Sequence, residues 1–257
     1  MFHFSALPMS RPFLLGAIHM PAFVYGESQD LHKIEAWLLR NVENYIEGGF
    51  DSVMIQDNTP RCSGLENKSL VYISALSYAV SSHFPNFPLG LIIESNDAQN
   101  AITIAAATHL QYVRCKVFVG AMQKPAGMMN GSAAEAFHFR KMADRDISLF
   151  ADIFDRMGAP LYDRDYSLAI AQAQKYGADA AILTGGSFEE SCRLLDTARK
   201  QFPQLPFFLG GGVDETNIQD AAQHCDGMVI SSCLTKDGFK DEWDRQKISR
   251  ISRLLES

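Results

Sequence analysis

The sequence has no apolar run long enough to cross a membrane. Such a span needs roughly 18 to 20 consecutive apolar residues, and no run of that length occurs among the 257 residues. The opening segment, residues 1–13, also lacks the charged region followed by an apolar stretch that marks a secretory signal. Both absences predict a cytoplasmic protein without membrane insertion.

Cysteine is scarce and scattered. The five cysteines are odd in number and never form a CxxC pair, so the sequence favours neither a disulfide framework nor a zinc site. Cys115 and Cys233 fall in or beside predicted strands, where a thiol is more often a buried apolar group than a nucleophile. No GxxxxGKS/T motif is present, which disfavours a nucleotide hydrolase of the P-loop type.

Basic residues are outnumbered, since 23 Lys and Arg face 30 Asp and Glu, for a formal net charge of -7. Nucleic-acid binding draws on dense Lys and Arg, so we expect no nucleic-acid polymer among the partners and only a small ligand for any phosphate site. A hydrophobic content of 47% over this length supports a sizeable core. We expect one domain over residues 1–257, because the length is typical of one β/α barrel.

Short apolar runs alternate with longer segments of helical periodicity, which is the pattern of a parallel sheet covered by helices. Most of the runs end in polar residues or glycine. The sequence therefore predicts an α/β fold, a single (β/α)8 barrel, with strands at Phe13–His19, Ser52–Asp57, Leu89–Glu94, Tyr112–Lys116, Ser148–Ile153, Ala180–Thr184, Phe207–Gly211 and Met228–Ser232.

The last two predicted strands end in residues with little or no side chain. FFLGGGV places Gly211 and Gly212 after one strand, and DGMVISS places Ser231 and Ser232 after the next. Backbone N–H groups can approach an anion closely at such ends, and the loops after the last two strands are the standard phosphate site of a β/α barrel. We expect a phosphate cradle here, with helices beginning near Thr216 and Leu234.

Strand-end residues are the first candidates for chemistry, because the active site of a β/α barrel lies at the C-terminal ends of its strands. His19, Asp57, Glu94, Lys116 and Asp152 hold such positions. Imidazole titrates near neutrality, so His19 and Asp152 are predicted to exchange protons with a substrate. The alternative for His19 is a structural histidine that closes the barrel end.

The segment IIESND brings together Glu94, Asn96 and Asp97. Glu94 is a third catalytic candidate, and with Asn96 it could orient substrate hydroxyls. Glu94 and Asp97 could instead bind Mg²⁺, which prefers oxygen ligands, although the sequence requires no cofactor. The alternative for Asp97 is an N-cap of the following helix.

Two cations share one face of the fourth predicted strand, because Arg114 and Lys116 lie two residues apart. Lys116 could form a Schiff base, but the pair favours anchoring of a phosphate or carboxylate. After the sixth strand, Thr184, Gly185 and Gly186 form a further N–H-rich turn that could hold part of the ligand. The alternative is an ordinary tight turn into a helix.

The stretch Gly120–Ser132 after the fourth strand is long, glycine-punctuated and rich in methionine. These features suit a loop that folds over a ligand. An ordered surface excursion is the alternative, because length and glycine do not establish motion.

Several motifs resemble those of the BtpA family over nearly the whole chain. They are GAIHM, RCKVFVGAM, GMMNGSAAEAFHFRK, FADIF, ILTGG, GGGV with Asn217 downstream, and DGMVISSCLTKDG. The resemblance implies a β/α barrel of the ribulose-phosphate-binding type. Members include a cyanobacterial factor linked to photosystem I accumulation and proteins associated with sugar-uptake gene clusters, without an agreed reaction.

The resemblance also carries site residues onto this chain. The matching positions are His19, Asn96, Asp97, Asp152, Thr184, Gly185, Gly211, Gly212, Ser231 and Ser232. This chain departs from the family at Gln56-Asp57-Asn58, at Cys115-Lys116 and at Arg156-Met157. These departures fall at the predicted barrel mouth, so they imply a different substrate or altered chemistry.

Three functions follow as hypotheses. The first is an enzyme that isomerises, epimerises or cleaves a phosphorylated small molecule, such as a sugar phosphate or phosphoribosyl compound. The second is a non-catalytic assembly or regulatory factor that keeps the ligand pocket as a sensor. The third, nucleotide hydrolysis through Glu94 and Asp97, has the least support. A homo-oligomer is compatible with each of them.

Overall fold

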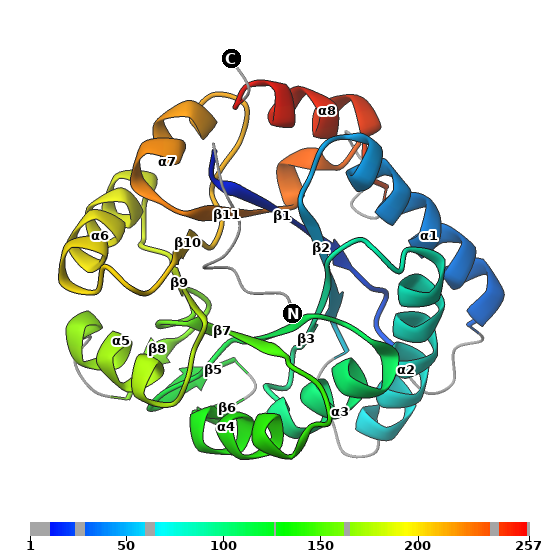
Figure 1. The fold of residues 1–257 in the computed structure, drawn as a ribbon, viewed down its shortest axis with the longest axis horizontal. Helices are drawn as coiled ribbons and strands as arrows, with labels where there is room; N and C mark the ends of the chain where they lie inside the picture. The colour runs from blue at the N-terminus through cyan, green and yellow to red at the C-terminus, as the bar shows by residue number, and fades with distance from the viewer. Residues whose placement is uncertain are drawn as a thin grey trace.

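Parallel strands close a barrel that helices surround (Figure 1). The computed structural model describes residues 11–23, 29–59, 65–125, 127–161, 165–236 and 242–255. Eight strands in these residues form the barrel in the order β1-β11-β10-β9-β7-β4-β3-β2. Their bounds are β1 (Phe13–His19), β2 (Ser52–Asp57), β3 (Leu89–Ile93), β4 (Tyr112–Cys115), β7 (Ser148–Asp152), β9 (Ala180–Leu183), β10 (Phe207–Leu209) and β11 (Gly227–Ile230).

The helices follow the strands in alternation, as the sequence pattern predicts. In chain order they are α1 (Leu31–Glu47), α2 (Leu65–His83), α3 (Ala98–Thr108), α4 (Ala133–Met142), α5 (Tyr166–Lys175), α6 (Phe188–Gln201), α7 (Ile218–His224) and α8 (Arg245–Arg253). None of these helices is both long and apolar enough to cross a membrane.

Local signals set several helix ends. Asp97 and Ser187 cap α3 and α6 by accepting backbone N–H groups of Asn100 and Glu190. The expected helix starts at Thr216 and Leu234 are wrong. Asn217, one residue later, precedes α7, and Leu234 ends a short 3-10 turn, Ser232–Leu234, that follows β11.

Several predicted strands are one or two residues too long at their C-terminal ends. Glu94, Lys116 and Thr184 lie just beyond β3, β4 and β9, and the last residues of FFLGG and MVISS lie beyond β10 and β11. The apolar character of the sequence does not mark where each strand ends, because a strand ends where its backbone stops pairing with the neighbouring strands and the loop begins. The polar strand-end residues therefore belong to the loops of the barrel mouth.

Aromatic side chains fill one layer of the barrel interior. Tyr112 stacks on Phe150 with ring centroids 4.8 Å apart, and Phe208 lies 5.2 Å from Phe150. The Tyr112 hydroxyl lies 2.7 Å from Ser52 Oγ, so the one polar group of the layer has a buried partner. Gly90 makes room for the Tyr112 ring, since a Cβ at position 90 would lie 2.1 Å from it.

The stretch Gly120–Ser132, for which the sequence left a loop over a ligand and an ordered surface excursion open, contains a β-hairpin. β5 (Ala121–Lys124) pairs antiparallel with β6 (Gly127–Asn130) and with β8 (Ala159–Pro160). Met122 and Met129 pack beneath it with Val117 in a small apolar cluster. Two of the methionines that suggested contact with a ligand thus pack within the protein, while Met128 is exposed.

A buried ion pair fastens this hairpin to the loop after β7. Lys124 donates a hydrogen bond to Asp155, and both side chains are more than 90% buried. Burial alone would raise the pKa of Asp155, but the hydrogen bonds from Lys124 and from the N–H of Met157, with the charges of Lys116 and Lys124, lower it. Asp155 is therefore charged at neutral pH and neutralises Lys124.

We predict that Gly90→Ala destabilises the fold by about 1–3 kcal/mol, because the added methyl forces the Tyr112 ring out of its layer. Chemical denaturation measures the change. In a Tyr112→Leu background the same substitution should cost less, since the clashing ring is gone. An equal cost in both backgrounds would contradict this packing.

We predict that Asp155→Asn destabilises the fold by about 3–5 kcal/mol at pH 7, because it leaves the Lys124 ammonium buried without a counter-charge. The pKa of Asp155 is lowered by folding, so its contribution is present above the ordinary carboxyl pKa and is lost as pH falls through the folded value. Denaturation of both proteins from pH 7 to pH 3 should show the difference shrinking below about pH 4.

The control for this prediction is the double variant Lys124→Met with Asp155→Asn, which removes both charges. It should recover most of the lost stability. A double variant as unstable as Asp155→Asn, or a pH-independent difference, would show that the ion pair is not the cause.

Candidate active site

The C-terminal ends of the barrel strands surround a cavity of about 260 Å³. Nine of the predicted site residues line it: His19, Arg114, Lys116, Asp152, Thr184, Gly211, Gly212, Ser231 and Ser232. Five other predicted residues, Glu94, Asn96, Asp97, Gly185 and Gly186, do not. No described residue of the β5–β6 hairpin lines this cavity either.

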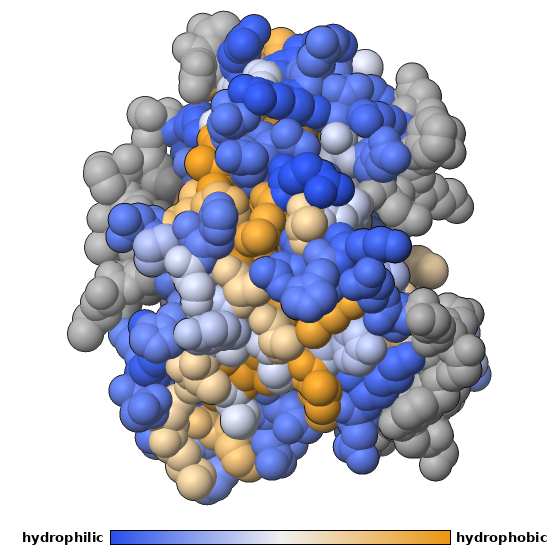
Figure 2. Space-filling model, turned by 90° about the vertical axis from the view of Figure 1, so that its right-hand side faces the viewer, coloured by the Kyte–Doolittle hydropathy of each residue, from blue (hydrophilic) through white to orange (hydrophobic). Residues whose placement is uncertain are grey.

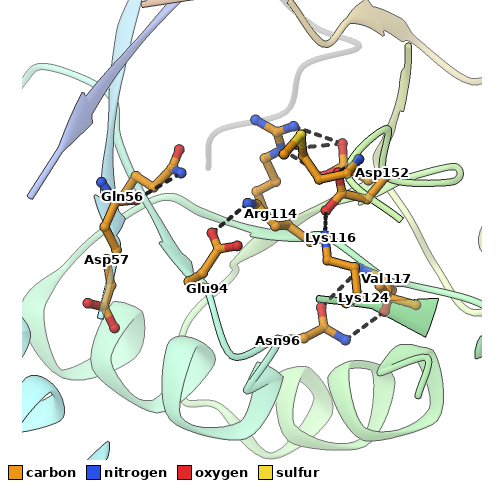
Figure 3. Close-up of polar contacts among 12 residues, drawn as sticks. Gln56, Asp57, Glu94, Asn96, Arg114, Lys116, Val117, Lys124 and Asp152 are labelled. Atoms are coloured by element: carbon orange, nitrogen blue, oxygen red, sulfur yellow. Dashed lines mark hydrogen bonds and ion pairs between the residues drawn. The ribbon is translucent and has the colours of Figure 1, made fainter. Parts of the chain in front are cut away.

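A bidentate ion pair between Arg114 and Asp152 joins the neighbouring strands β4 and β7 at the cavity (Figure 3). Arg114 on β4 donates from Nη2 to Asp152 Oδ1 at 3.0 Å and from Nε to Asp152 Oδ2 at 3.1 Å. Both side chains are nearly buried. Burial raises the pKa of Asp152, an effect that the charge and hydrogen bonds of Arg114 oppose and that the negative charge of Asp155 reinforces. Asp152 therefore forms an ion pair with Arg114, while its pKa lies above the ordinary value of an aspartate.

Lys116 makes the second ion pair of this strand end. Its Nζ lies 2.5 Å from Glu94 Oε2, and its side chain is largely buried. In Figure 3, Glu94 reaches the ammonium from the loop after β3. Lys116 lines the cavity and Glu94 does not, so Glu94 acts on the cavity through Lys116 in this arrangement.

Asn96 and Asp97 shape the loops behind the cavity. Asn96 has a left-handed backbone with φ of 62°, and its amide binds the N–H and C=O of Val117 and the C=O of Asn130 (Figure 3). Asp97 caps α3, and both of its carboxylate oxygens accept from Asn100. For Asp97 the capping alternative is therefore the one observed.

The predicted Mg²⁺ ligands already have partners. Glu94 is paired with Lys116 and Asp97 with Asn100, and no group of three or more His, Cys, Asp or Glu suited to a metal ion occurs in the described residues. The carboxylates of this region do not fit a ready-made Mg²⁺ site.

The N–H groups of the turn after β9 are hydrogen-bonded to side chains of the following helix, α6. Gly185 N–H donates to Ser191 Oγ at 2.9 Å, and Gly186 N–H donates to Glu190 Oε2 at 2.7 Å. These two N–H groups are occupied, which matches the alternative of a tight strand-to-helix turn. Thr184, one residue earlier, does line the cavity.

The glycine turn after β10 has the opposite character. Gly211 and Gly212 have φ of 149° and 81°, a conformation that side chains disfavour, and none of the described residues accepts a hydrogen bond from either N–H group. Asn217 holds the turn in shape by donating to the C=O of Gly212 and accepting from the N–H of Asp214. Two backbone donors are therefore left at the cavity wall.

The turn after β11 completes this side of the cavity. Ser231 donates its hydroxyl to the C=O of Ala17 at 2.6 Å, which ties β11 to β1. Ser232 begins the 3-10 turn and lines the cavity beside the glycine turn. The Ser231 hydroxyl proton is thus used in a hydrogen bond within the protein. Its oxygen could still accept a hydrogen bond from a ligand.

A cation that was not among the predicted site residues lies over the glycine turn. Arg156, in the loop after β7, lines the cavity, and its guanidinium Nη1 is 3.7 Å from where a Cβ of Gly211 would be. It has no ion pair among the described residues, whereas Arg114, Lys116 and Lys124 each have one. The sequence signal was the departure at Arg156-Met157, which marked the position without giving it a role.

Asp155 and Gln56 were also absent from the predicted site, and both line the cavity. Asp155 could have been found as a second carboxylate three residues after Asp152. Asp57 follows Gln56 at the end of β2 and was one of the strand-end candidates. Its side chain points away from that of Gln56 (Figure 3), is buried, and accepts a hydrogen bond from the N–H of Thr59. Burial raises the pKa of Asp57, partly offset by these hydrogen bonds.

His19 and Asp152 lie on opposite sides of the cavity. They end β1 and β7, which are separated by three strands in either direction around the barrel. Burial raises the pKa of the Cys115 thiol to about 12 and that of the Cys233 thiol to about 11, which disfavours the nucleophilic thiolate form at both positions. Cys62 lies outside the described residues.

Solved structures share this architecture at low identity. Tryptophan synthase from M. tuberculosis, in an open form, matches with a TM-score of 0.64 at 12% identity, covering 96% of this chain and 94% of that chain. Phosphoribosyl anthranilate isomerase from Thermococcus kodakaraensis matches with a TM-score of 0.56 at 15% identity, over 95% and 98% of the two chains. These similarities confirm the barrel fold.

Sequence comparison identifies the family. A curated relative, the photosystem I biogenesis protein BtpA of Synechocystis sp., is 26% identical over 200 residues, which cover 76% of this chain and 70% of the relative. The sequence pattern of the BtpA family matches residues 1–257. The chain therefore belongs to the BtpA family.

Proposed function

We propose that the protein is an enzyme acting on a phosphorylated small molecule, a sugar phosphate or phosphoribosyl compound, by acid–base isomerisation, epimerisation or aldol-type cleavage. The observation that carries the proposal is the glycine turn at Gly211 and Gly212, which lines the cavity beside the Arg156 guanidinium and whose two N–H groups have no acceptor among the described residues. Backbone donors and an unpaired cation are the usual elements of phosphate recognition.

The charge balance of the cavity favours an anion. Arg114, Lys116 and Lys124 are neutralised by Asp152, Glu94 and Asp155, which leaves the positive charge of Arg156. A phosphate dianion would supply its counter-charge and would accept from Gly211, Gly212 and Ser232 at the wall formed after β10 and β11. Binding at this wall directs the rest of the ligand across the mouth.

The opposite wall would supply proton transfer. With the phosphate fixed, the carbon skeleton would lie between His19 and Asp152, which end strands on opposite sides of the barrel. Burial raises the pKa of Asp152, which improves a carboxyl group as an acid or base near neutral pH. Lys116 would stabilise negative charge that develops on a substrate carbonyl oxygen, with Glu94 holding the ammonium in place.

Names of similar proteins agree with this class without fixing a reaction. Phosphoribosyl anthranilate isomerase and an aldolase for 4-hydroxy-2-oxoglutarate, with a TM-score of 0.57 at 15% identity, share the barrel. Folds of this kind host many reactions, so the choice among isomerase, epimerase and lyase depends on the ligand. A cytoplasmic location suits such a substrate and remains part of the proposal.

The second candidate is a non-catalytic factor that uses the same cavity as a sensor. The paired state of Asp152 and Glu94 favours it, because each carboxylate already forms an ion pair with a cation of the protein, Arg114 or Lys116. The name of the Synechocystis relative, a photosystem I biogenesis protein, points the same way.

We predict that phosphorylated compounds raise the melting temperature of the protein, because a ligand that binds only the folded state stabilises it. The panel comprises sugar phosphates, phosphoribosyl compounds, nucleotides and inorganic phosphate, each with and without Mg²⁺. Arg156→Gln should weaken binding of the best compound about 10- to 100-fold, as expected for loss of one charge-assisted hydrogen bond of about 1.5–3 kcal/mol.

The matched control is Arg40→Gln, which removes an exposed arginine on α1, outside the cavity. It should leave the temperature shift unchanged. Equal losses in both variants would show a general charge effect, and the absence of any shift across the panel would refute the cradle.

We predict that Asp152→Asn separates the enzyme from the sensor. In the enzyme, the variant should lower turnover of the best-stabilising compound by about 10²–10⁴-fold, because the proton-transfer group is lost while the anion wall is intact. Proton NMR in D₂O measures turnover as deuterium incorporation or product formation. Glu43→Gln, an exposed carboxyl on α1, is the control. A wild-type protein that binds the compound without exchange or turnover would support the sensor instead.

A further inference from the structure

A second cavity opens beside the candidate active site, at the mouth end of β1. Its volume is about 230 Å³, and the residues that line it are His19, Pro21, Lys33, Ile34 and Trp37. His19 ends β1, Pro21 follows in the next loop, and the other three belong to the first turns of α1. The cavity therefore lies between the loop after β1 and the start of the helix to which this loop leads.

The walls of this cavity are apolar. Pro21, Ile34 and Trp37 supply a pyrrolidine ring, a branched aliphatic chain and an indole. The charged lining residue, Lys33, stands at the rim, because 86% of its side chain is exposed. The neighbouring cavity differs in character, since it holds the ion pair of Arg114 and the glycine turn.

The helix α1 turns different residues toward this cavity and toward solvent. Figure 2 looks at the side of the barrel that bears α1 and α2, where hydrophilic surface is interrupted by apolar patches. His32, Arg40 and Glu43 are exposed on α1. Ile34 and Trp37 are instead partly buried and line the cavity. The apolar side chains at the start of α1 therefore face the loop after β1.

The Trp37 ring is held by a second aromatic residue. Trp243 is buried and packs against it edge-to-face, with the ring centroids 5.8 Å apart and an angle of 64° between the ring planes. An indole that is already held in place offers apolar surface with little ordering cost on binding. Aromatic rings pack on one another in offset-stacked or edge-to-face pairs. The cavity is thus suited to a flat aromatic group.

The two cavities are continuous at His19, which lines both. In the barrel, β1 adjoins β11, and Ser231 after β11 is hydrogen-bonded to Ala17 of β1. The proposed phosphate position after β10 and β11, the His19 side chain and the apolar cavity therefore follow one another around the mouth of the barrel.

The cavities also complement each other in size. Ligand pockets have volumes of ~300–1,000 Å³ and combine mostly apolar walls with a few placed polar groups. The volumes here are about 260 Å³ and about 230 Å³, so neither cavity alone reaches that range and the two together do. One cavity contains the charged groups, and the other contains the apolar walls.

We propose that the cavity at Pro21, Ile34 and Trp37 is an aromatic subsite, which makes the substrate class a phosphorylated compound that carries an aromatic ring. This inference rests on the proposed function, because the phosphate would bind at the glycine turn while the ring packs on Trp37. The carbons that join the two ends would pass His19, the predicted proton donor and acceptor.

The test compares phosphates that differ only in a ring. Isothermal titration calorimetry of the full chain measures the Kd of 2-phenylethyl, 3-phenylpropyl and 4-phenylbutyl phosphate, each against ethyl, propyl or butyl phosphate, and the Kd of inorganic phosphate. At least one phenyl compound should bind about 10- to 100-fold more tightly than its alkyl partner, as expected for burial of one aromatic ring.

Two variants test whether this gain arises at the aromatic subsite. Trp37→Leu removes the indole surface, and Ile34→Gln makes the wall polar without adding charge, so either should reduce the gain to about 3-fold or less. Both positions are partly exposed on α1, so the variants should fold and keep the wild-type Kd for inorganic phosphate. In Trp243→Phe, Trp37 is the one tryptophan of the sequence, and the phenyl compound should shift its fluorescence more than the alkyl partner does.

The control is Leu168→Gln, which makes a similar polar change at an apolar residue that is exposed on α5 and lines neither cavity. It should keep the full gain. Alkyl phosphates that bind without any gain from the ring, or a gain retained in both α1 variants, would overturn the aromatic subsite and leave the proposed anion site intact. If neither inorganic phosphate nor any alkyl phosphate binds, the proposed function fails, and the aromatic subsite fails with it.

Discussion

Buried charge at the mouth of the barrel must be neutralised, and this requirement organises the candidate site. β4 carries Arg114 and ends at Lys116, both largely buried, and an unpaired cation in such surroundings would cost several kcal/mol. Asp152 from β7 and Glu94 from the loop after β3 supply the two counter-charges. The same rule binds Lys124 of the hairpin to Asp155. Each pair fixes a loop and a strand end together.

This pairing determines which groups remain for a ligand. Once the buried cations are neutralised, Arg156 and the N–H groups of Gly211 and Gly212 are left at the cavity wall. They lie after β7 and β10, so the proposed anion site is built from loops far apart in sequence. Asn217 holds the glycine turn through two hydrogen bonds. The donors are thus positioned before a ligand arrives, which reduces the ordering cost of binding.

The sequence predicted the barrel because its buried strands are continuous apolar runs that alternate with longer segments of helical periodicity. The pairing of the hairpin with β8 was not predicted, since β8 is a two-residue strand that follows β5 by 35 residues or more. Local pattern carries no signal for such a contact. Asn96 illustrates the same limit within the site, because a polar residue after a strand looks the same whether it meets a substrate or, as here, the backbone of Val117. Arg156 was undervalued because its proximity to Gly211 arises from the fold alone.

The central claim is that the turns after β10 and β11 form an anion site with Arg156. The most direct measurement is a titration of the ¹⁵N-labelled protein with inorganic phosphate, followed through backbone amide chemical shifts. The account predicts saturable shifts at the N–H groups of Gly211, Gly212 and Ser232, reduced in Arg156→Gln. Shifts confined to surface lysines on other elements, or none at these three residues, would contradict it.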